Sequence, residues 1–480
     1  MSSRNQEQPP LKILFATSEC APLVKTGGLG DVSSALPAAL REAGLDVRVL
    51  LPGYPSVLAA CARATEAGRM TALGYPVRLL DAELPHGVPL IILDCPVLFD
   101  RGGGPYQADD GEDWVDNALR FGVLSRVAAT LGTRHSPLEW RPDVVHCNDW
   151  PASLAAAYLA LEHGPRAATL VTIHNLAFQG NFDTRDIHRL ELPPQALGME
   201  GIEFYGDYSF LKGGLVYGDA INTVSPTYAR EIQGAELGFH MDGVLRMRAD
   251  RLFGVLNGID TELWDPRTDP YIASRYGPDS LERKAANKAA LRERFSLGGP
   301  GSVALLGMVT RLTDQKGVDL VIAAHEELLG MPAQVVIVGT GDRELVDSLY
   351  AMHAAHPRDF GVTIGFDEPL AHMVEAGADM FLMPSRFEPC GMNQMYSQRY
   401  GTPPIANATG GLVDTVEDGK TGFMMKEATR EELVGACRRA LACWKDRKRW
   451  HAMQAAGMAK DFGWRAAARE YESIYRKIAR

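Results

Sequence analysis

Short apolar runs rich in β-branched residues alternate with stretches of helical period along nearly the whole chain. The first runs, LKILFATS (11–18) and LDVRVLLP (45–52), flank a Gly-rich turn and an amphipathic stretch that predicts a helix over 31–42. Later runs such as DVVHCND, ATLVTIHN and AINTVS are equally short and end in polar residues. Near-continuous apolar runs are typical of parallel strands covered on both faces, so the pattern predicts right-handed βαβ units in doubly wound sheets.

A second series of strand and helix patterns begins near LFGVLNGID (252–260) and continues through SVALLGMVT (302–310) and AQVVIVGTGD (333–342). A chain of 480 residues also exceeds what one hydrophobic core usually serves. We therefore expect an α/β protein of two Rossmann-like domains, an N-terminal one over 1–252 and a C-terminal one over 253–462. The last stretch, 463–480, has apolar positions at helical spacing and predicts an amphipathic helix.

Composition narrows the classes of partner. The net charge of -11 disfavours a nucleic acid or an anionic membrane as the general partner. Seven scattered cysteines without C-x-x-C spacing predict neither a disulfide framework nor a zinc site. The opening MSSRNQEQPP lacks the apolar core of a signal peptide, and no apolar run approaches the roughly 18 to 20 residues of a membrane span. We therefore expect a cytoplasmic protein.

The polar residues that end each strand are the first candidates for chemistry, because ligands of open α/β sheets bind beyond the carboxyl ends of the strands. Lys25, Gly27 and Gly28 lie at such an end, where glycines let the backbone approach a phosphate. The pattern matches neither common glycine-rich nucleotide motif, so an ordinary turn with a solvated lysine is the better interpretation in isolation.

Three later strand ends of the first half carry further polar residues. HCNDWPA places Asp149 after a strand, TIHNLAFQG places His174 and Asn175 after another, and LNGID places Asn257 in a turn. A strand-end histidine is at least as often a hydrogen-bonded structural residue, and Asn-Gly is a common turn dipeptide. Taken one at a time, none of these segments identifies a site.

The second half carries a richer set. TRLTDQKGVD sets Arg311 and Lys316 after a strand, as two cations that suit a diphosphate. SRFEPCGMNQ follows a strand with Glu388, which can accept hydrogen bonds from sugar hydroxyls. In NATGGLVDT two glycines again precede a predicted helix, as they do in the first half. Together these strand ends indicate a ligand that combines a sugar with phosphate.

Several longer segments match one family. The chain resembles the bacterial glycogen synthases, which are retaining glucosyltransferases related to plant starch synthases. The resemblance covers about residues 11 to 470 and is carried, in the family's order, by KTGGLGDV, TIHNLAFQG, YGDYSFLKGGLVYGDAINTVSPTYAREI, VLNGIDTELWDP, TRLTDQKGVDL, SRFEPCGMNQMYSQRYGT and TGGLVDTV.

The resemblance implies a fold and a reaction. The fold is that of the GT-B glycosyltransferases, two Rossmann-like doubly wound domains facing a central cleft, with the acceptor on the N-terminal side and the nucleotide sugar on the C-terminal side. The C-terminal helix, 463–480, would cross back and complete the first domain. The reaction moves glucose from ADP-glucose to the non-reducing 4-hydroxyl end of an α-1,4-glucan such as glycogen. The anomeric configuration is retained, and no metal or other cofactor is required.

The resemblance also implies roles for single residues. Arg311 and Lys316 would hold the diphosphate, Glu388 the glucose hydroxyls, His174 the glucose 6-hydroxyl side, and Asp149 would lie near the anomeric centre. These five would be the catalytic residues. The donor-binding residues would be Lys25, Gly27, Gly28, Asn257, Phe366 (as adenine platform), Cys390, Gly391, Thr409 and Gly410, with Tyr106 and Asn175 as accessory contacts.

The chain departs from the family at two positions. Asn148 and Pro151 stand in CNDWPAS where family members usually carry His, which puts acceptor handling in doubt more than donor binding. Four other interpretations stay open: a related retaining transferase with another acceptor, a sugar-nucleotide epimerase, a phosphorylase, and a non-catalytic glucan-binding scaffold. The sequence also leaves open the choice between ADP-glucose and UDP-glucose and the oligomeric state.

Overall fold

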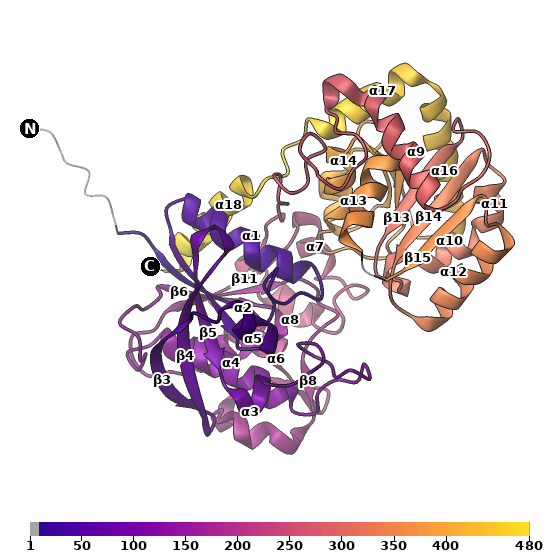
Figure 1. The fold of residues 1–480 in the computed structure, drawn as a ribbon. Coiled ribbons are helices and arrows are strands. Elements are labelled where there is room, and N and C mark those ends of the chain that lie inside the picture. The colour runs from indigo at the N-terminus through magenta and orange to yellow at the C-terminus, as the bar shows by residue number, and fades with distance from the viewer. Residues whose placement is uncertain (1–8, 366, 480) are drawn as a thin grey trace, which may run out of the picture. The chain divides into compact units, whose positions relative to one another are not determined.

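The computed structural model describes residues 9–365 and 367–479, which fold into two compact units (Figure 1). The first unit runs to Gly258 and is completed by Trp464–Arg480, and the second unit is Ile259–Gly463. The sequence pattern places these boundaries at 252 and 462. No helix in the described part of the chain has both the length and the apolar character that crossing a membrane would need.

The first unit is built on a nine-stranded sheet. Most neighbouring strands pair in parallel, which follows from the apolar runs noted above because both faces of the sheet are covered by helices. In spatial order the strands are β12 (Leu252–Gly254), β11 (Ala220–Thr223), β7 (Ala168–Ile173), β6 (Val144–Asn148), β1 (Lys12–Ala16), β2 (Asp46–Pro52), β5 (Val88–Asp94), β4 (Tyr75–Leu84) and β3 (Thr65–Ala72).

One edge of this sheet is antiparallel, which the sequence pattern did not predict. β4 pairs antiparallel with both β5 and β3, and β3 and β4 are joined by Leu73 and Gly74, both at positive φ. Two left-handed residues are what a tight two-residue hairpin requires. Alternate residues of β3 and β4 are exposed, so these strands lack the continuous apolar character of the buried parallel strands.

The helices of the first unit cover the two faces of this sheet. A small antiparallel sheet of β8 (Asn181–Phe182), β9 (Glu203–Phe204) and β10 (Asp207–Ser209) lies among their connections. The helices are α1 (Gly28–Glu42), α2 (Pro55–Ala60), α3 (Pro96–Phe99), α4 (Asn117–Leu131), α5 (Asp149–Ala160), α6 (Phe210–Tyr217), α7 (Pro226–Glu231), α8 (Asp242–Met247) and α18 (Trp464–Ile478).

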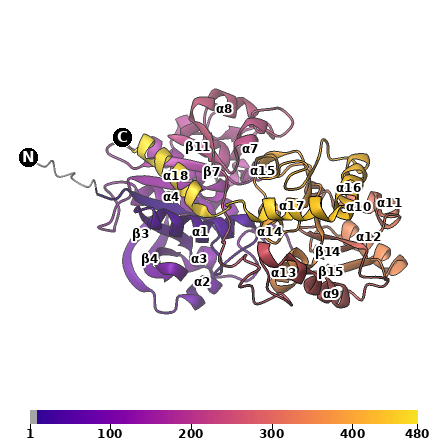
Figure 2. The ribbon, with the colours of Figure 1, turned by 90° about the horizontal axis from the view of Figure 1, so that it is seen from above.

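The C-terminal helix α18 belongs to the first unit, where it packs beside α1 (Figures 1 and 2). Two buried tyrosines fix it to the sheet. The Tyr475 hydroxyl lies 2.8 Å from Nδ1 of His146 on β6, and the Tyr471 hydroxyl accepts a 2.8 Å hydrogen bond from Asn222 on β11. Burial lowers the pKa of His146 well below its usual value, so the ring is neutral and needs these partners.

The chain crosses between the units twice, and the two crossings run close together. Gly258 leaves room for this, because a Cβ there would lie 2.8 Å from the backbone nitrogen and Cα of Trp464. One residue further on, the Ile259 N–H donates to the Phe462 carbonyl over 2.8 Å.

The second unit contains a six-stranded sheet that is parallel throughout. Its strands in spatial order are β15 (Phe360–Ile364), β14 (Ala333–Gly339), β13 (Ala304–Val309), β16 (Met380–Met383), β17 (Pro404–Asn407) and β18 (Phe423–Met425). Its helices are α9 (Lys284–Arg294), α10 (Val318–Ala323), α11 (His325–Leu329), α12 (Arg343–Ala355), α13 (Glu368–Gly377), α14 (Asn393–Arg399), α15 (Gly410–Thr415), α16 (Arg430–Lys445) and α17 (Arg447–Met458).

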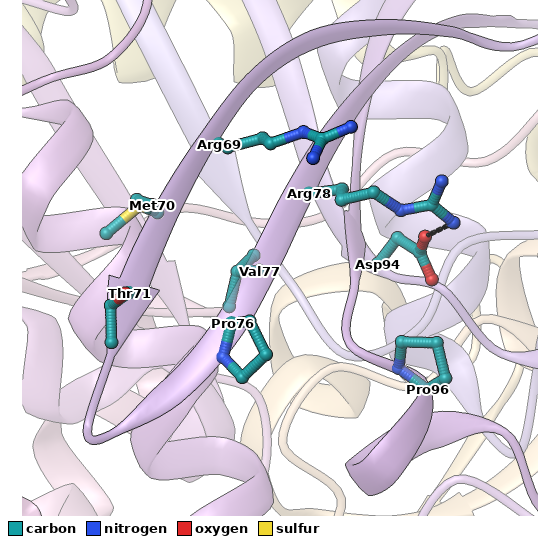
Figure 3. Close-up of a pocket in the computed structure, with 8 residues that line it drawn as sticks. All are labelled: Arg69, Met70, Thr71, Pro76, Val77, Arg78, Asp94 and Pro96. Carbon is teal, nitrogen blue, oxygen red and sulfur yellow. Dashed lines mark ion pairs between the residues drawn. The ribbon is translucent and has the colours of Figure 1, made fainter.

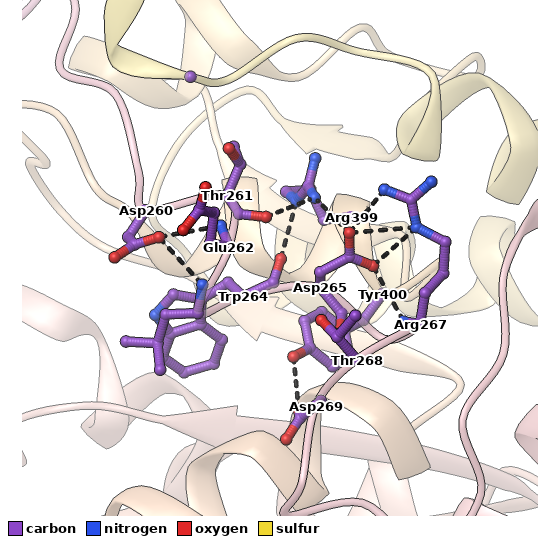
Figure 4. Close-up of polar contacts among 12 residues, drawn as sticks. Asp260, Thr261, Glu262, Trp264, Asp265, Arg267, Thr268, Asp269, Arg399 and Tyr400 are labelled. Carbon is purple, nitrogen blue, oxygen red and sulfur yellow. Dashed lines mark hydrogen bonds and ion pairs between the residues drawn. The ribbon is translucent and has the colours of Figure 1, made fainter. Parts of the chain in front are cut away.

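The segment that enters the second unit, 260–276, is fastened to α13 and α14, and Figure 4 shows its contacts with Arg399 and Tyr400. The Trp264 ring is stacked between His372 of α13 and Tyr396 of α14, with ring centroids 3.8 and 3.9 Å away. Arg399, at the end of α14, donates to the Trp264 carbonyl over 2.8 Å. The hydroxyl of Tyr400 donates to the buried carboxylate of Asp269 over 2.6 Å. Stacking and charged hydrogen bonds therefore hold this segment in place.

We expect Tyr475→Phe to lower the free energy of unfolding by about 1–3 kcal/mol, because it leaves a buried ring nitrogen of His146 without its partner. Urea unfolding followed by circular dichroism measures this change. Arg469→Ala, at an exposed position of the same helix, is the matched control and should change stability by less than about 0.5 kcal/mol. Equal effects of the two substitutions would contradict the anchoring role of Tyr475.

Candidate active site

In the second unit the structure brings together a lysine and a glutamate that follow different strands. Lys316 lies in the loop after β13 and Glu388 in the loop after β16, and these two strands are neighbours. The Lys316 Nζ lies 2.6 Å from Glu388 Oε2, and the two side chains are only 17% and 6% exposed. A cation and a carboxylate that suit phosphate and sugar hydroxyls are therefore held against each other at one edge of the sheet.

The loop that carries Glu388 is fixed from several sides. The Ser385 hydroxyl donates to Glu388 Oε2 over 3.2 Å, and the Asn407 side chain donates to the Ser385 carbonyl over 2.9 Å. The Gln394 amide donates to the carbonyls of Cys390 and Gly391, each over 3.0 Å. Most of these partners are buried, so Glu388 cannot move without breaking buried hydrogen bonds.

Gly410 and Gly411, which follow Thr409, pack against this same loop. A Cβ on Gly410 would lie 1.9 Å from the Glu388 carbonyl oxygen, and one on Gly411 would lie 2.1 Å from the Cys390 carbonyl oxygen. Any side chain at these positions would therefore push the two loops apart. The Gly411 N–H donates to the Glu388 carbonyl over 3.1 Å, which joins the start of α15 to the Glu388 loop.

Arg311 lies at the same edge of the sheet but outside the Lys316–Glu388 pair. It is exposed, and its Nη2 is 3.5 Å from Gln315 Oε1. Gln315 connects the two loops, because its side chain donates to the Phe387 carbonyl over 3.3 Å. Arg311 is thus a solvent-facing cation beside a fixed, buried ion pair.

In the first unit, Asp149 begins α5 directly after β6. Its φ of +51° lies in the left-handed region, which is uncommon outside glycine. Its Oδ1 accepts a 2.7 Å hydrogen bond from the His174 N–H, which follows β7. Burial, opposed by the backbone N–H donors and assisted by the nearby Glu19 carboxylate, raises the pKa of this carboxyl group to about 7. Near neutral pH Asp149 therefore exchanges between a charged and an uncharged form.

His174 is held by Asn148, one of the two residues that depart from the family pattern. The Asn148 side-chain nitrogen donates to the Ala16 carbonyl over 3.1 Å, so its oxygen faces His174 Nε2 at 3.0 Å. Nε2 then carries the proton and Nδ1 is the acceptor. Burial lowers the pKa of His174 to about 3, so the ring is neutral. Its neighbour Asn175 accepts from the Ala177 N–H over 3.1 Å.

The Lys-Thr-Gly-Gly loop follows β1 and leads into α1, which begins at Gly28. Lys25 forms a 2.7 Å ion pair with Asp31 in the first turn of that helix. The Gly27 N–H donates to the Glu19 carboxylate over 3.2 Å, and the Tyr106 hydroxyl donates to the same carboxylate over 2.7 Å. Two separate segments, one with predicted donor-binding residues and one with the predicted accessory residue Tyr106, thus meet at one glutamate.

Two expected residues, Asn257 and Phe366, have no described side-chain contacts that assign them to the site. Asn257 is buried in the first unit, and its side-chain oxygen has no hydrogen-bond partner among the described residues. Phe366, the expected adenine platform, lies outside the described residues. Sequence reasoning missed Glu19, Asn148 as the holder of His174, and Ser385. Glu19 and Ser385 are polar residues just beyond strands, which is the signal that identified the other candidates.

A hollow of about 500 Å³ lies over the antiparallel edge of the first unit (Figure 3) and contains none of the expected site residues. Its two arginines are locally neutralised, since Arg78 forms an ion pair with Asp94 and Arg69 forms one with Glu66. The charges of this hollow are therefore balanced, and it is separate from the residues described above. Its lining residues are Arg69, Met70, Thr71, Pro76, Val77, Arg78, Asp94 and Pro96.

Comparison with known proteins identifies the families that the chain matches. Residues 12–247 match the starch synthase catalytic domain family, and residues 291–454 match the glycosyl transferases group 1 family. The glycogen synthase of Aromatoleum aromaticum is 54% identical over 476 residues, which cover 97% of this chain and 96% of that protein. The glycogen synthase of Nitrosospira multiformis is 50% identical over 485 residues, 98% of each chain.

Solved structures give the same result. The catalytic domain of starch synthase IV from Arabidopsis thaliana, bound to ADP and acarbose, matches with a TM-score of 0.87 and 29% identity, covering 98% of this chain and 100% of that one. The two-domain GT-B glycosyltransferase fold expected from the sequence is confirmed. With near full-length identities of about half to curated members, the chain belongs to the glycogen synthase family.

Proposed function

We propose that this chain transfers glucose from ADP-glucose to the non-reducing 4-hydroxyl end of an α-1,4-glucan, with retention of the anomeric configuration and without a metal. Membership in the glycogen synthase family supports glucosyl transfer in glycogen synthesis. The observation that carries the proposal is the buried Lys316–Glu388 pair, because it supplies both charges that a nucleoside diphosphate sugar requires.

The pair is organised before a substrate arrives. While no donor is bound, the ammonium and the carboxylate neutralise each other, which limits the cost of burying them. A bound diphosphate would take the ammonium as a partner, and the glucose hydroxyls would donate to the carboxylate. Arg311, exposed at the same edge, would add a second cation for the charge that develops on the leaving diphosphate. Fixed charges aimed at developing charge are usually the largest catalytic contribution.

The first unit would contribute Asp149 and His174. An ionised Asp149 near the anomeric centre would stabilise the positive charge that develops on the sugar when the bond to the diphosphate breaks. Neutral His174 would accept a hydrogen bond from a glucose hydroxyl at Nδ1, because Nε2 already donates to Asn148. In this proposal Asn148 orients His174, because the side-chain oxygen of Asn148 accepts the hydrogen bond from the ring.

We expect Lys316→Ala and Glu388→Gln to lower kcat by about 100- to 1,000-fold, because each removes one preorganised charge from the transition state. Initial rates of glucose transfer to glycogen, measured over a range of ADP-glucose concentrations, test this. Lys288→Ala is the matched control, because Lys288 forms a 2.6 Å pair with Asp379 that is similarly buried in the same unit. That pair lies at the opposite ends of the strands, beside the first residues of β13 and β16. The control should lose stability but keep its kcat.

We expect Asp149→Asn to remove a pH-dependent step. The wild type should lose kcat/KM as the pH falls below about 7 and Asp149 takes up a proton, whereas the variant should be slow and independent of pH in this range. As the pH rises from about 4 to 7, Asp149 is already ionised in the unfolded chain but still protonated in the folded one. The free energy of unfolding of the wild type therefore falls as the pH rises through this range. The stability gain of the variant should therefore grow from pH 4 to 7 and then level off. A pH-independent difference in the thermal midpoint would contradict the raised pKa.

We expect ADP-glucose to be used at least about tenfold more efficiently than UDP-glucose, as measured by kcat/KM with glycogen as the acceptor. Pretreatment with EDTA should leave the rate unchanged, because Arg311 and Lys316 supply the positive charge that the diphosphate needs. Faster transfer from UDP-glucose would overturn the donor assignment. Donor isomerisation without acceptor, or transfer to inorganic phosphate in place of glycogen, would overturn the reaction itself.

A further inference from the structure

Glu19 is a buried carboxylate at the end of β1 that no sequence motif singled out. Glu19 is only 3% exposed, and its carboxylate accepts four hydrogen bonds. Oε2 accepts from the N–H groups of Thr26 at 2.6 Å and Gly27 at 3.2 Å. Oε1 accepts from the hydroxyls of Thr26 and Tyr106, both at 2.7 Å.

These four contacts form a site for an anion. Backbone N–H groups before a helix and two hydroxyl donors are what a phosphate oxygen would also seek. Burial, and after it the Glu19 charge, raise the pKa of Tyr106 well above its usual value, so the phenol stays protonated and donates. The Thr26 and Gly27 amides of the Lys-Thr-Gly-Gly loop are therefore already occupied by a carboxylate of the chain itself.

The geometry points to Glu19 as the internal anion around which the Lys-Thr-Gly-Gly loop folds, and as the positioning residue for Lys25 and Tyr106 in glucosyl transfer. The role in transfer rests on the proposed function. Glu19 itself does not touch the substrate in this assignment. It acts through the loop, whose Thr26 and Gly27 amides wrap its carboxylate.

The Glu19 carboxylate can position both Lys25 and Tyr106, because it binds the residue next to Lys25 and the hydroxyl of Tyr106 itself. Lys25 directly precedes Thr26, whose N–H and hydroxyl both bind Glu19. Tyr106 comes from a distant loop, and its hydroxyl also contacts Ser18 at 2.7 Å. Its ring packs 5.9 Å from that of Trp150, the residue after Asp149. Loss of Glu19 would therefore remove the one support that both share, leaving Lys25 with its ion pair to Asp31 and Tyr106 with its contact to Ser18.

A second possible role of Glu19 predicts the opposite effect on donor binding. If Glu19 only occupied the two amides until the donor phosphate displaced it, removing Glu19 would free the amides and tighten binding of ADP-glucose and ADP. If Glu19 positions the loop, its removal cannot tighten donor binding and should slow the transfer step. The sign of the change in KM for the donor and in inhibition by ADP separates the two.

The test uses full-length Glu19→Ala and Glu19→Gln. We expect Glu19→Ala to lower kcat about 10- to 100-fold, the range for lost hydrogen bonds to a charged group, without lowering the donor KM. Glu19→Gln should recover part of the rate, since its oxygen can still accept from the two amides while the hydroxyls reverse toward its NH₂ group. Glu203→Gln is the control: Glu203 also accepts a backbone N–H, that of Gly206 at 2.9 Å, and its rate should not change.

Hydrogen exchange gives a readout that does not depend on transfer. The Thr26 and Gly27 amides should exchange about 10- to 100-fold faster in Glu19→Ala than in the wild type, with partial protection in Glu19→Gln. If wild-type protein transfers no glucose, the proposed function fails while the loop assignment is still tested by exchange. Unchanged exchange, an unchanged kcat, or tighter binding of ADP in Glu19→Ala would each overturn the assignment of Glu19.

Discussion

The parallel sheet imposes the constraint on which the rest of this structure depends. A parallel strand must return to its starting edge through a helix, so the carboxyl ends of successive strands lie at the same edge. In the first unit this brings together the ends of β1, β6 and β7, with Glu19, Asp149 and His174. In the second unit it brings the loops after β13 and β16 into contact through Lys316 and Glu388.

Three buried carboxylates at these edges are compensated in three different ways. Glu388 is paired with a lysine, and Glu19 is surrounded by four N–H and O–H donors. Asp149 has backbone donors but no ion-pair partner in the described part of the chain, and burial raises its pKa to about 7. Burying a charge is costly unless it is paired or hydrogen-bonded, so the environment sets which carboxylate stays ionised. Asp149 is thereby placed to change its charge near neutral pH.

Residues far from these strand ends fix the framework that carries them. Tyr475 and Tyr471 of α18 contact His146 on β6 and Asn222 on β11, so the helix that closes the first unit is bonded to the strands that precede the site residues. In the second unit the Trp264 stack and Arg399 fasten the entering segment to α13 and α14. α14 begins just after the Glu388 loop, and Gln394 on it holds that loop.

The sequence by itself determined the architecture and predicted most of the candidate site residues, because apolar runs of parallel strands and the polar residues behind them are local patterns. It did not determine the antiparallel edge of β3 and β4, where half-exposed strands lack such runs. Tertiary structure alone decided the partners: that Lys316 meets Glu388, that Asn148 orients His174, and that Glu19 occupies the amides of its own glycine loop. The first two of these contacts join residues distant in the chain, and the burial that makes such partners necessary depends on the whole fold.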